Sequence, residues 1–90
     1  MSLPDPAPIR DLIEAFRRSK TMFAAVSMGI FDRLHSAAAR AADLATELGV
    51  NQDALERLLD ACAALGLLSK QDGVYANHAV AEAYLVTSSR

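Results

Sequence analysis

The stretch "ALERLLDACAALGLLSKQDGVYAN", from Ala54 to Asn77, carries the strongest fold signal in the 90-residue chain. Its first part repeats apolar residues at three- and four-residue steps, which is the spacing of a helix with one buried face. Gly66 ends that pattern, and the favoured hairpin turn Asp72-Gly73 then separates two short apolar runs. The stretch therefore predicts a helix followed by a β-hairpin, which is the plan of a winged helix-turn-helix.

The predicted helix has a clear beginning and a clear buried face. Asn51 is a favourable N-cap, and Asp53 lies in the first turn, where the helix dipole favours negative charge. Its inward positions are expected to anchor the core and are Leu55, Leu58, Leu59, Cys62 and Leu65. Winged helices often bind DNA, yet this helix carries Asp53, Glu56 and Asp60 against a single Arg57. Its charge therefore disfavours contact with phosphate.

The flanking sequence completes a mostly helical fold. Toward the N-terminus we expect a disordered segment over residues 1–8, a helix over about 9–27, a short helix over 30–35, a connector over 36–41 and a helix over about 41–48 ending at Gly49. Arg40 is a poor N-cap, so the 41–48 helix is expected to start late or fray. Asn77 is expected to cap a last helix over about 78–85, with inward residues Val80, Ala81, Tyr84 and Leu85. Residues 9–90 thus form one winged-helix-like domain, with a helix-turn-helix core and a short hairpin wing.

Composition limits the partners of this domain. Hydrophobic residues make up 52% of the chain and aromatic residues only 6%, so the core is aliphatic and alanine-rich. This is a large apolar share for a small chain, and it suggests that part of the apolar surface is buried against another chain or domain. The net charge of −2 disfavours nucleic acid as the partner, because domains that bind nucleic acid are usually basic. No apolar run is long enough for a membrane span. The single Cys62 excludes an internal disulfide and fits a cytoplasmic protein.

Catalytic and ligand-binding motifs are missing from the sequence. There is no glycine-rich dinucleotide motif and no P-loop. His35 and His78 have no neighbouring metal ligands, and Cys62 is expected to be a buried apolar residue rather than a nucleophile. We therefore predict no catalytic, cofactor-binding or metal-binding residue in this chain.

The first helix carries the candidate interaction residues. Its cluster Arg17, Arg18 and Lys20 is expected to be a solvated face paired with Asp11 and Glu14. The large apolar residues on the helix and just after it are Phe16, Met22, Phe23, Met28 and Phe31. Two assignments remain open for them: part of the group fills the core, and the rest lines a dimer interface or an apolar pocket.

Three ordered blocks of sequence resemble one family. They are "SKTMFAAVSMGIFDRL", "AADLATELGVNQDALERLLDACAALGLL" and "GVYANHAVAEAYL". Together they are similar to the N-terminal dimerisation domain of S-adenosylmethionine-dependent small-molecule O-methyltransferases, in particular the acetylserotonin O-methyltransferase-like branch. The similarity covers about residues 9–89, which is nearly the whole chain.

The resemblance implies a winged-helix domain that no longer binds DNA and intertwines with a second copy in a homodimer. It also implies a further Rossmann-like domain, outside this sequence, that binds S-adenosylmethionine and methylates a small hydroxylated aromatic substrate. Phe16, Ser19 and Phe23 are the positions that would face the partner's substrate pocket. The alternatives are a winged-helix DNA-binding transcription regulator and a free-standing helical interaction module.

Overall fold

The computed structural model describes residues 3–87, which form five helices and a small antiparallel sheet. In chain order the elements are α1 (Ala7–Ser27), α2 (Ile30–Ser36), β1 (Ala39–Arg40), α3 (Ala41–Leu48), α4 (Gln52–Ala64), β2 (Leu68–Gln71), β3 (Val74–Asn77) and α5 (Ala79–Tyr84). Helix α1 begins at Ala7, so the last two residues of the segment expected to be disordered are helical. The mostly helical fold is confirmed.

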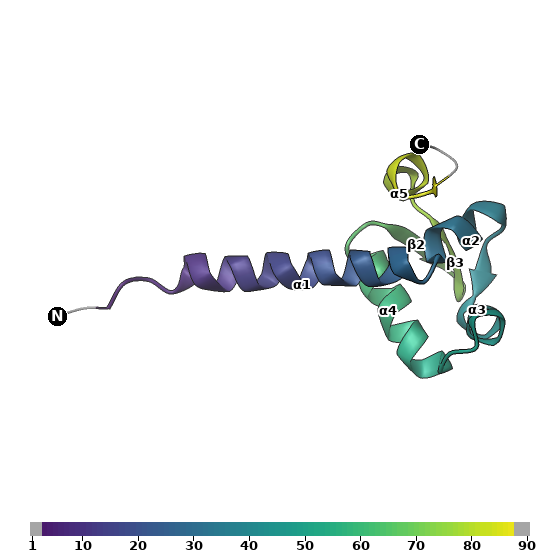
Figure 1. The fold of residues 1–90 in the computed structure, drawn as a ribbon, viewed down its shortest axis with the longest axis horizontal. Coiled ribbons are helices and arrows are strands. Elements are labelled where there is room, and N and C mark those ends of the chain that lie inside the picture. The colour runs from purple at the N-terminus through teal and green to yellow at the C-terminus, as the bar shows by residue number, and fades with distance from the viewer. Residues whose placement is uncertain (1–2, 88–90) are drawn as a thin grey trace.

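Helix α1 gives the molecule its elongated shape. The principal extents are 57, 30 and 23 Å, and Figure 1 shows the first half of α1 projecting away from the body formed by the other elements. A helix of this length spans about 30 Å. Only its C-terminal part packs on the body, where Ala25 is fully buried. The N-terminal half of α1 therefore has little cover within its own chain.

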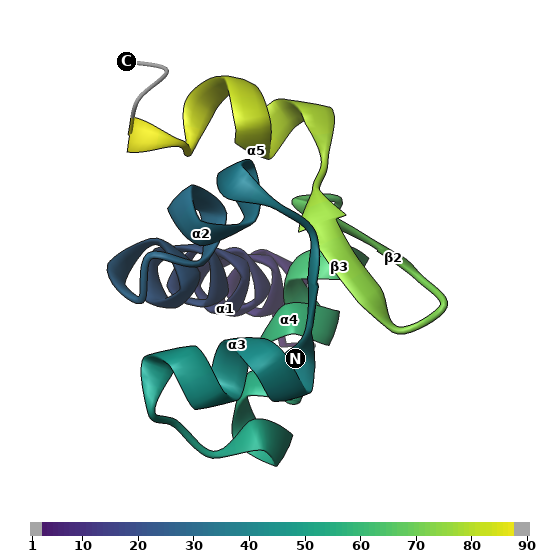
Figure 2. The same ribbon diagram turned by 90° about the vertical axis from the view of Figure 1, so that its right-hand side faces the viewer.

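The core lies where the C-terminal part of α1 meets α2, α3, α4 and the sheet (Figure 2). Its largest fully buried side chains are Tyr75, Phe31, Ile30, Leu44, Leu59, Val86 and Cys62. The prediction that α4 anchors this core is confirmed, because Leu55, Leu59 and Cys62 are buried. Leu58 and Leu65 are half-buried at its margin.

The turn between α3 and α4 follows the sequence prediction closely. Gly49 adopts a left-handed conformation at the end of α3, with φ of 67°. Asn51 then caps α4, because its side-chain oxygen accepts a hydrogen bond of 2.9 Å from the backbone N–H of Ala54. Nearby, the Arg33 guanidinium of α2 donates to both carboxylate oxygens of Glu47, at 2.6 and 3.1 Å, and so ties α2 to α3.

The sheet has the strand order β1-β3-β2, and all its pairs are antiparallel. Strands β2 and β3 form the predicted hairpin, closed by the pair Gln71 and Val74. Both turn residues are left-handed, with φ of 54° at Asp72 and 77° at Gly73, as the tight hairpin turn requires. Arg40 steadies the turn, since its guanidinium donates to the carbonyl of Asp72 at 3.0 Å.

The segment before α3 differs from its prediction. Ala39 and Arg40, expected to be part of a connector, form the short strand β1 paired with Tyr75 and Val74 of β3. Helix α3 starts at Ala41 without a side-chain cap, so the expected late start is wrong. Pairing with β3 fixes the backbone just before Ala41, which replaces the missing cap.

The environment of α5 also differs from its prediction. His78, rather than Asn77, occupies the N-cap position. The Asn77 amide instead donates to the Phe31 carbonyl and to Glu82, both at 2.8 Å, so the predicted capping role is wrong. Ala81 is buried as expected, but Val80 and Tyr84 are 46% and 72% exposed. A helix of six residues can turn only one narrow face toward the core.

Candidate interaction surface

One side of α1 carries a row of large apolar side chains that the described part of the chain leaves open. Five large side chains there are between 46% and 68% exposed, namely Ile9, Leu12, Ile13, Phe16 and Phe23. Their three- and four-residue steps place them on one face of the helix. We call these five residues the α1 stripe. Such a contiguous apolar patch on a small domain marks a surface that another molecule covers.

The α1 stripe lies on the side of α1 that faces away from the body. Ala25 is fully buried, and Met22 is half-buried where α1 meets the body. By the 3.6-residue period, Ala25 lies on the opposite side of the helix from Phe16 and Phe23, and Met22 lies between the two sides. Lys20 falls within the α1 stripe, and its aliphatic stem can lie along the neighbouring rings while its charge stays in water. One face of α1 thus packs on the core of its own chain, and the other face is exposed and apolar.

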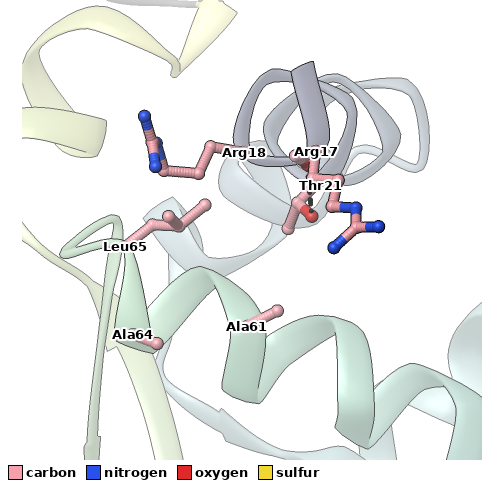
Figure 3. Close-up of a pocket in the computed structure, with 6 residues that line it drawn as sticks. All are labelled: Arg17, Arg18, Thr21, Ala61, Ala64 and Leu65. Atoms are coloured by element: carbon pink, nitrogen blue, oxygen red, sulfur yellow. Dashed lines mark hydrogen bonds between the residues drawn. The ribbon is translucent and has the colours of Figure 1, made fainter. Parts of the chain in front are cut away.

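Two open hollows flank α1 where it crosses the end of α4. The larger is about 230 Å³ and is lined by Arg17, Arg18, Thr21, Ala61, Ala64 and Leu65. Figure 3 shows Arg17 and Arg18 extending to either side of α1 above the apolar residues of α4. The second is about 200 Å³ and is lined by Arg18, Ser19, Met22, Leu65 and Leu67. Their apolar floors extend the uncovered surface from α1 onto the body.

The structure places the six candidate residues in three different surroundings, two residues in each. Phe16 and Phe23 lie in the α1 stripe, while Ser19 and Met22 line the second hollow. Phe31 is 1% exposed and belongs to the core, and Met28 packs against that core. Of the two assignments open for the large apolar residues, Phe31 and Met28 therefore follow the first, which is packing in the core.

Sequence reasoning missed three residues of the α1 stripe as candidates. Ile9, Leu12 and Ile13 are exposed, whereas the sequence analysis predicts only that a helix covers this segment. The signal in the sequence was the three- and four-residue spacing of these large apolar residues, which repeats the pattern of Phe16 one turn further along. An amphipathic pattern shows that a face will be buried and does not show by which molecule.

The basic cluster on α1 is exposed as predicted, and one pair, with Glu14, is formed. The Arg17 guanidinium pairs with Glu14 at 3.2 Å, one turn earlier, and both side chains are exposed. Arg18 and Lys20 are also exposed. These charges keep the outer surface of α1 solvated around the α1 stripe, and an exposed pair of this kind adds little stability.

The acidic side of α4 is partly engaged within the chain. Asp60 accepts hydrogen bonds from Tyr75 at 2.5 Å and from Lys70 at 2.9 Å, which join α4 to the hairpin. These bonds, first that from Tyr75 and then that from Lys70, hold the pKa of the Asp60 carboxyl below its usual value. Burial is the main reason that the pKa of Tyr75 is raised. Because the Lys70 ammonium pairs with the Asp60 carboxylate, it does not give the hairpin a net positive charge.

The other reactive side chains show no catalytic arrangement. Cys62 is buried, and desolvation raises the pKa of its thiol to about 11, so the thiolate is disfavoured. His35 pairs with Glu82, and His78 is exposed at the start of α5. Within residues 3–87, no three His, Cys, Asp or Glu side chains are grouped as metal ligands. In the same range, none of the helices has the length and apolar character of a membrane span.

Comparison with known proteins shows which family this chain belongs to. The family model described as the O-methyltransferase dimerisation domain matches residues 10–87. The chain is 42% identical over 81 residues to a 3-hydroxy-5-methyl-1-naphthoate 3-O-methyltransferase from Streptomyces sahachiroi, covering 90% of this chain and 24% of that protein.

Solved structures show the same domain. An O-methyltransferase family protein from Burkholderia thailandensis superposes with a TM-score of 0.85 and 32% identity, over 98% of this chain and 26% of the other. Human N-acetylserotonin methyltransferase in complex with SAM gives a TM-score of 0.80 and 30% identity, over 99% of this chain and 28% of the other. The chain therefore spans about a quarter of the length of the proteins that it matches.

Proposed function

Because this chain belongs to the O-methyltransferase dimerisation-domain family, we propose that it assembles two copies of an S-adenosylmethionine-dependent small-molecule O-methyltransferase into a homodimer. Binding of S-adenosylmethionine and the methyl-transfer chemistry are assigned to the part of the protein outside residues 1–90. In this proposal, residues 1–90 hold the two subunits together and supply no catalytic residue. The cytoplasmic location inferred from the single cysteine stays a prediction.

The observation that carries this proposal is the α1 stripe. Exposed large apolar side chains are unfavourable in water, and burying apolar surface yields roughly 25 cal/mol per Å². The first half of α1, which carries four of the five residues of the α1 stripe, projects beyond the body (Figure 1), so a second copy can enclose it from several sides. We infer an intertwined arrangement, in which the first half of α1 of one subunit packs on the body of the other.

The winged-helix-like architecture is best explained as a scaffold. Helices α3 and α4, followed by the hairpin of β2 and β3, have the order of a winged helix-turn-helix. In a DNA-binding member, the second helix of the pair would meet the major groove. Here α4 presents Asp53 and Asp60 at its surface, and phosphate would be repelled. Packing against protein is compatible with this charge, which favours the enzyme domain over a DNA-binding regulator.

We also propose that this domain forms part of the substrate-pocket wall of its partner subunit. Phe16 and Phe23 offer exposed aromatic faces, and Ser19 offers a hydroxyl on the same helix. Such a wall suits a small hydroxylated aromatic acceptor, since aromatic rings pack well on each other. An N-acetylserotonin methyltransferase and a hydroxynaphthoate methyltransferase among the similar proteins support this substrate class.

The test is a matched pair of substitutions in the full-length protein. Leu12→Asp places a charge in the α1 stripe, whereas Val50→Asp places one at an exposed apolar residue between α3 and α4. Light scattering should give a dimer mass for the unmodified protein and for Val50→Asp, and a monomer mass for Leu12→Asp. A monomeric unmodified protein, or a dimer unaffected by Leu12→Asp, would refute the proposal. Calorimetric titration with S-adenosylmethionine tests the enzyme assignment independently.

A further inference from the structure

The chain leaves the domain at a doubly anchored point. Val86 is buried, and the next residue, Thr87, is held by the carboxylate of Asp32 in α2. One Asp32 oxygen accepts the backbone N–H of Thr87 and the other accepts its hydroxyl, both at 2.7 Å. Charge-assisted pairs of this kind fix the direction of a backbone as well as its position.

The same helix also holds α5. His35 lies one turn after Asp32 and pairs with Glu82 of α5. The Asn77 amide donates to Glu82 and to the Phe31 carbonyl, at 2.8 Å each. The bond from Asn77 to Glu82, and then that from His35, hold the pKa of Glu82 below its usual value. Polar side chains thus connect α2 to the last helix, α5, and to Thr87, three residues after its end. We call Asp32, His35, Asn77, Glu82 and Thr87 the α2 clamp.

Helix α2 is itself rigidly placed next to the association helix. Its apolar residues Ile30, Phe31 and Leu34 are buried in the core. Only Met28 and Gly29 separate it from α1, and Gly29 adopts the left-handed conformation that makes this sharp bend. The α2 clamp therefore connects the point where the chain leaves the domain to the helix that carries the α1 stripe.

We propose that Asp32 is a positioning residue of the assembled enzyme, which fixes the direction of the chain after Thr87 and so sets the methyl-donor-binding part relative to α1. The inference rests on the proposed function, because it requires that part to follow this domain. It goes further by assigning a specific task to α2. The relative position of these two parts matters for the reaction. Helix α1 can line the substrate pocket of the partner subunit only if the methyl-donor-binding part is held at a constant distance and angle from it.

The position of these bonds supports a role in orientation rather than in folding. Asp32 and Thr87 are both exposed, so the bonds between them exclude little water and contribute little to the stability of the core. They act at the last described residue, beyond the buried Val86. Their main effect is therefore on the direction of the backbone at Thr87 itself.

The experiment compares the unmodified full-length dimer with four variants by small-angle scattering and amide hydrogen exchange. Asp32→Ala removes both acceptors, and Thr87→Val removes only the hydroxyl. Asp32→Asn keeps one acceptor oxygen and gains a donor for the hydroxyl, so it should behave as the rescue variant. Asp53→Ala is the matched control, because Asp53 also lies in the first turn of a helix and contributes the same dipole interaction.

We expect Asp32→Ala to remain dimeric and folded, with a larger radius of gyration and amides of residues 79–87 exchanging on the order of ten-fold faster. Thr87→Val should show a smaller change, and Asp32→Asn and Asp53→Ala should match the unmodified protein. If Asp32→Ala scatters and exchanges like Asp53→Ala, the inference is wrong. Loss of the dimer or of the fold in Asp32→Ala, with Thr87→Val unchanged, would equally overturn it. A monomeric unmodified protein would instead refute the proposed function.

Discussion

Replacing Phe23 by aspartate tests whether the exposed face of α1 contributes to dimer association rather than to folding. Phe23 is 60% exposed within its own chain, so the substitution removes few internal contacts. Exposed substitutions of this kind change folding stability by about 0.5 kcal/mol or less. In the dimer, by contrast, the ring is proposed to be covered, and the same substitution would leave a charge on an apolar surface.

The size of the effect follows from the exposed area. An aromatic side chain buries about 200 Å², of which the uncovered 60% corresponds to about 120 Å². At about 25 cal/mol per Å², covering it contributes roughly 3 kcal/mol per subunit. Since each 1.4 kcal/mol changes an equilibrium constant ten-fold, the dimer dissociation constant should rise by at least about 100-fold. Desolvation of the introduced carboxylate adds to this loss.

The assay is sedimentation equilibrium of the full-length protein over a range of concentrations, with urea unfolding followed in parallel. Phe31→Ala is the control, because Phe31 is buried within one chain and its truncation should cost about 3–5 kcal/mol of folding stability. Phe23→Asp should weaken association and leave the unfolding midpoint of the monomer nearly unchanged. If Phe23→Asp unfolds the domain as Phe31→Ala does, Phe23 is an ordinary core residue and the reasoning fails.

Three further predictions concern the fold that supports this surface. Asn51→Ala should lower the free energy of unfolding by about 1 kcal/mol in urea titration, because the N–H of Ala54 loses its cap, and an unchanged midpoint would contradict this. The pKa values of Asp60 and Glu82 are lowered in the folded state, so below about pH 4 the unfolded chain binds more protons; thermal unfolding should show stability falling as the pH drops through this range, and a flat profile would contradict the assignment. Cys62 is buried with a pKa of about 11, so it should react with a thiol reagent at pH 8 only after unfolding, and rapid reaction of the native protein would contradict the core assignment.

Local signals in the sequence were sufficient to predict most of the fold. Asn51, Gly49 and the pair Asp72-Gly73 each have one conformation that suits their chemistry, and each adopts it. The buried face of α4 followed from apolar spacing alone. Such signals work because they depend on neighbours in the chain.

The errors arose where distant residues decide the structure. Strand β1 exists because β3 lies beside Ala39 and Arg40, and nothing in those two residues favours a strand. Asn77 has the chemistry of a cap, yet the Phe31 carbonyl and Glu82 compete for its amide. Long-range pairing of this kind is invisible to local propensity.

The candidate surface was only partly predictable for a related reason. The sequence identified Phe16 and Phe23 as apolar residues in need of cover, but it did not distinguish them from Phe31, which has the same chemistry. Burial separates them, and burial depends on where α1 leaves the body. The same geometry added Ile9 and Leu12 to the α1 stripe.

Amide hydrogen exchange along the first half of α1 tests the central claim most directly. Residues 7–16 have few contacts within their own chain, so their helical hydrogen bonds should open easily in a monomer. We predict that in the full-length dimer these amides are protected as strongly as those of α4, and that Leu12→Asp or dissociation by dilution removes the protection selectively. Rapid exchange of residues 7–16 in the intact dimer, or protection that survives its dissociation, would show that the α1 stripe is not where two copies meet.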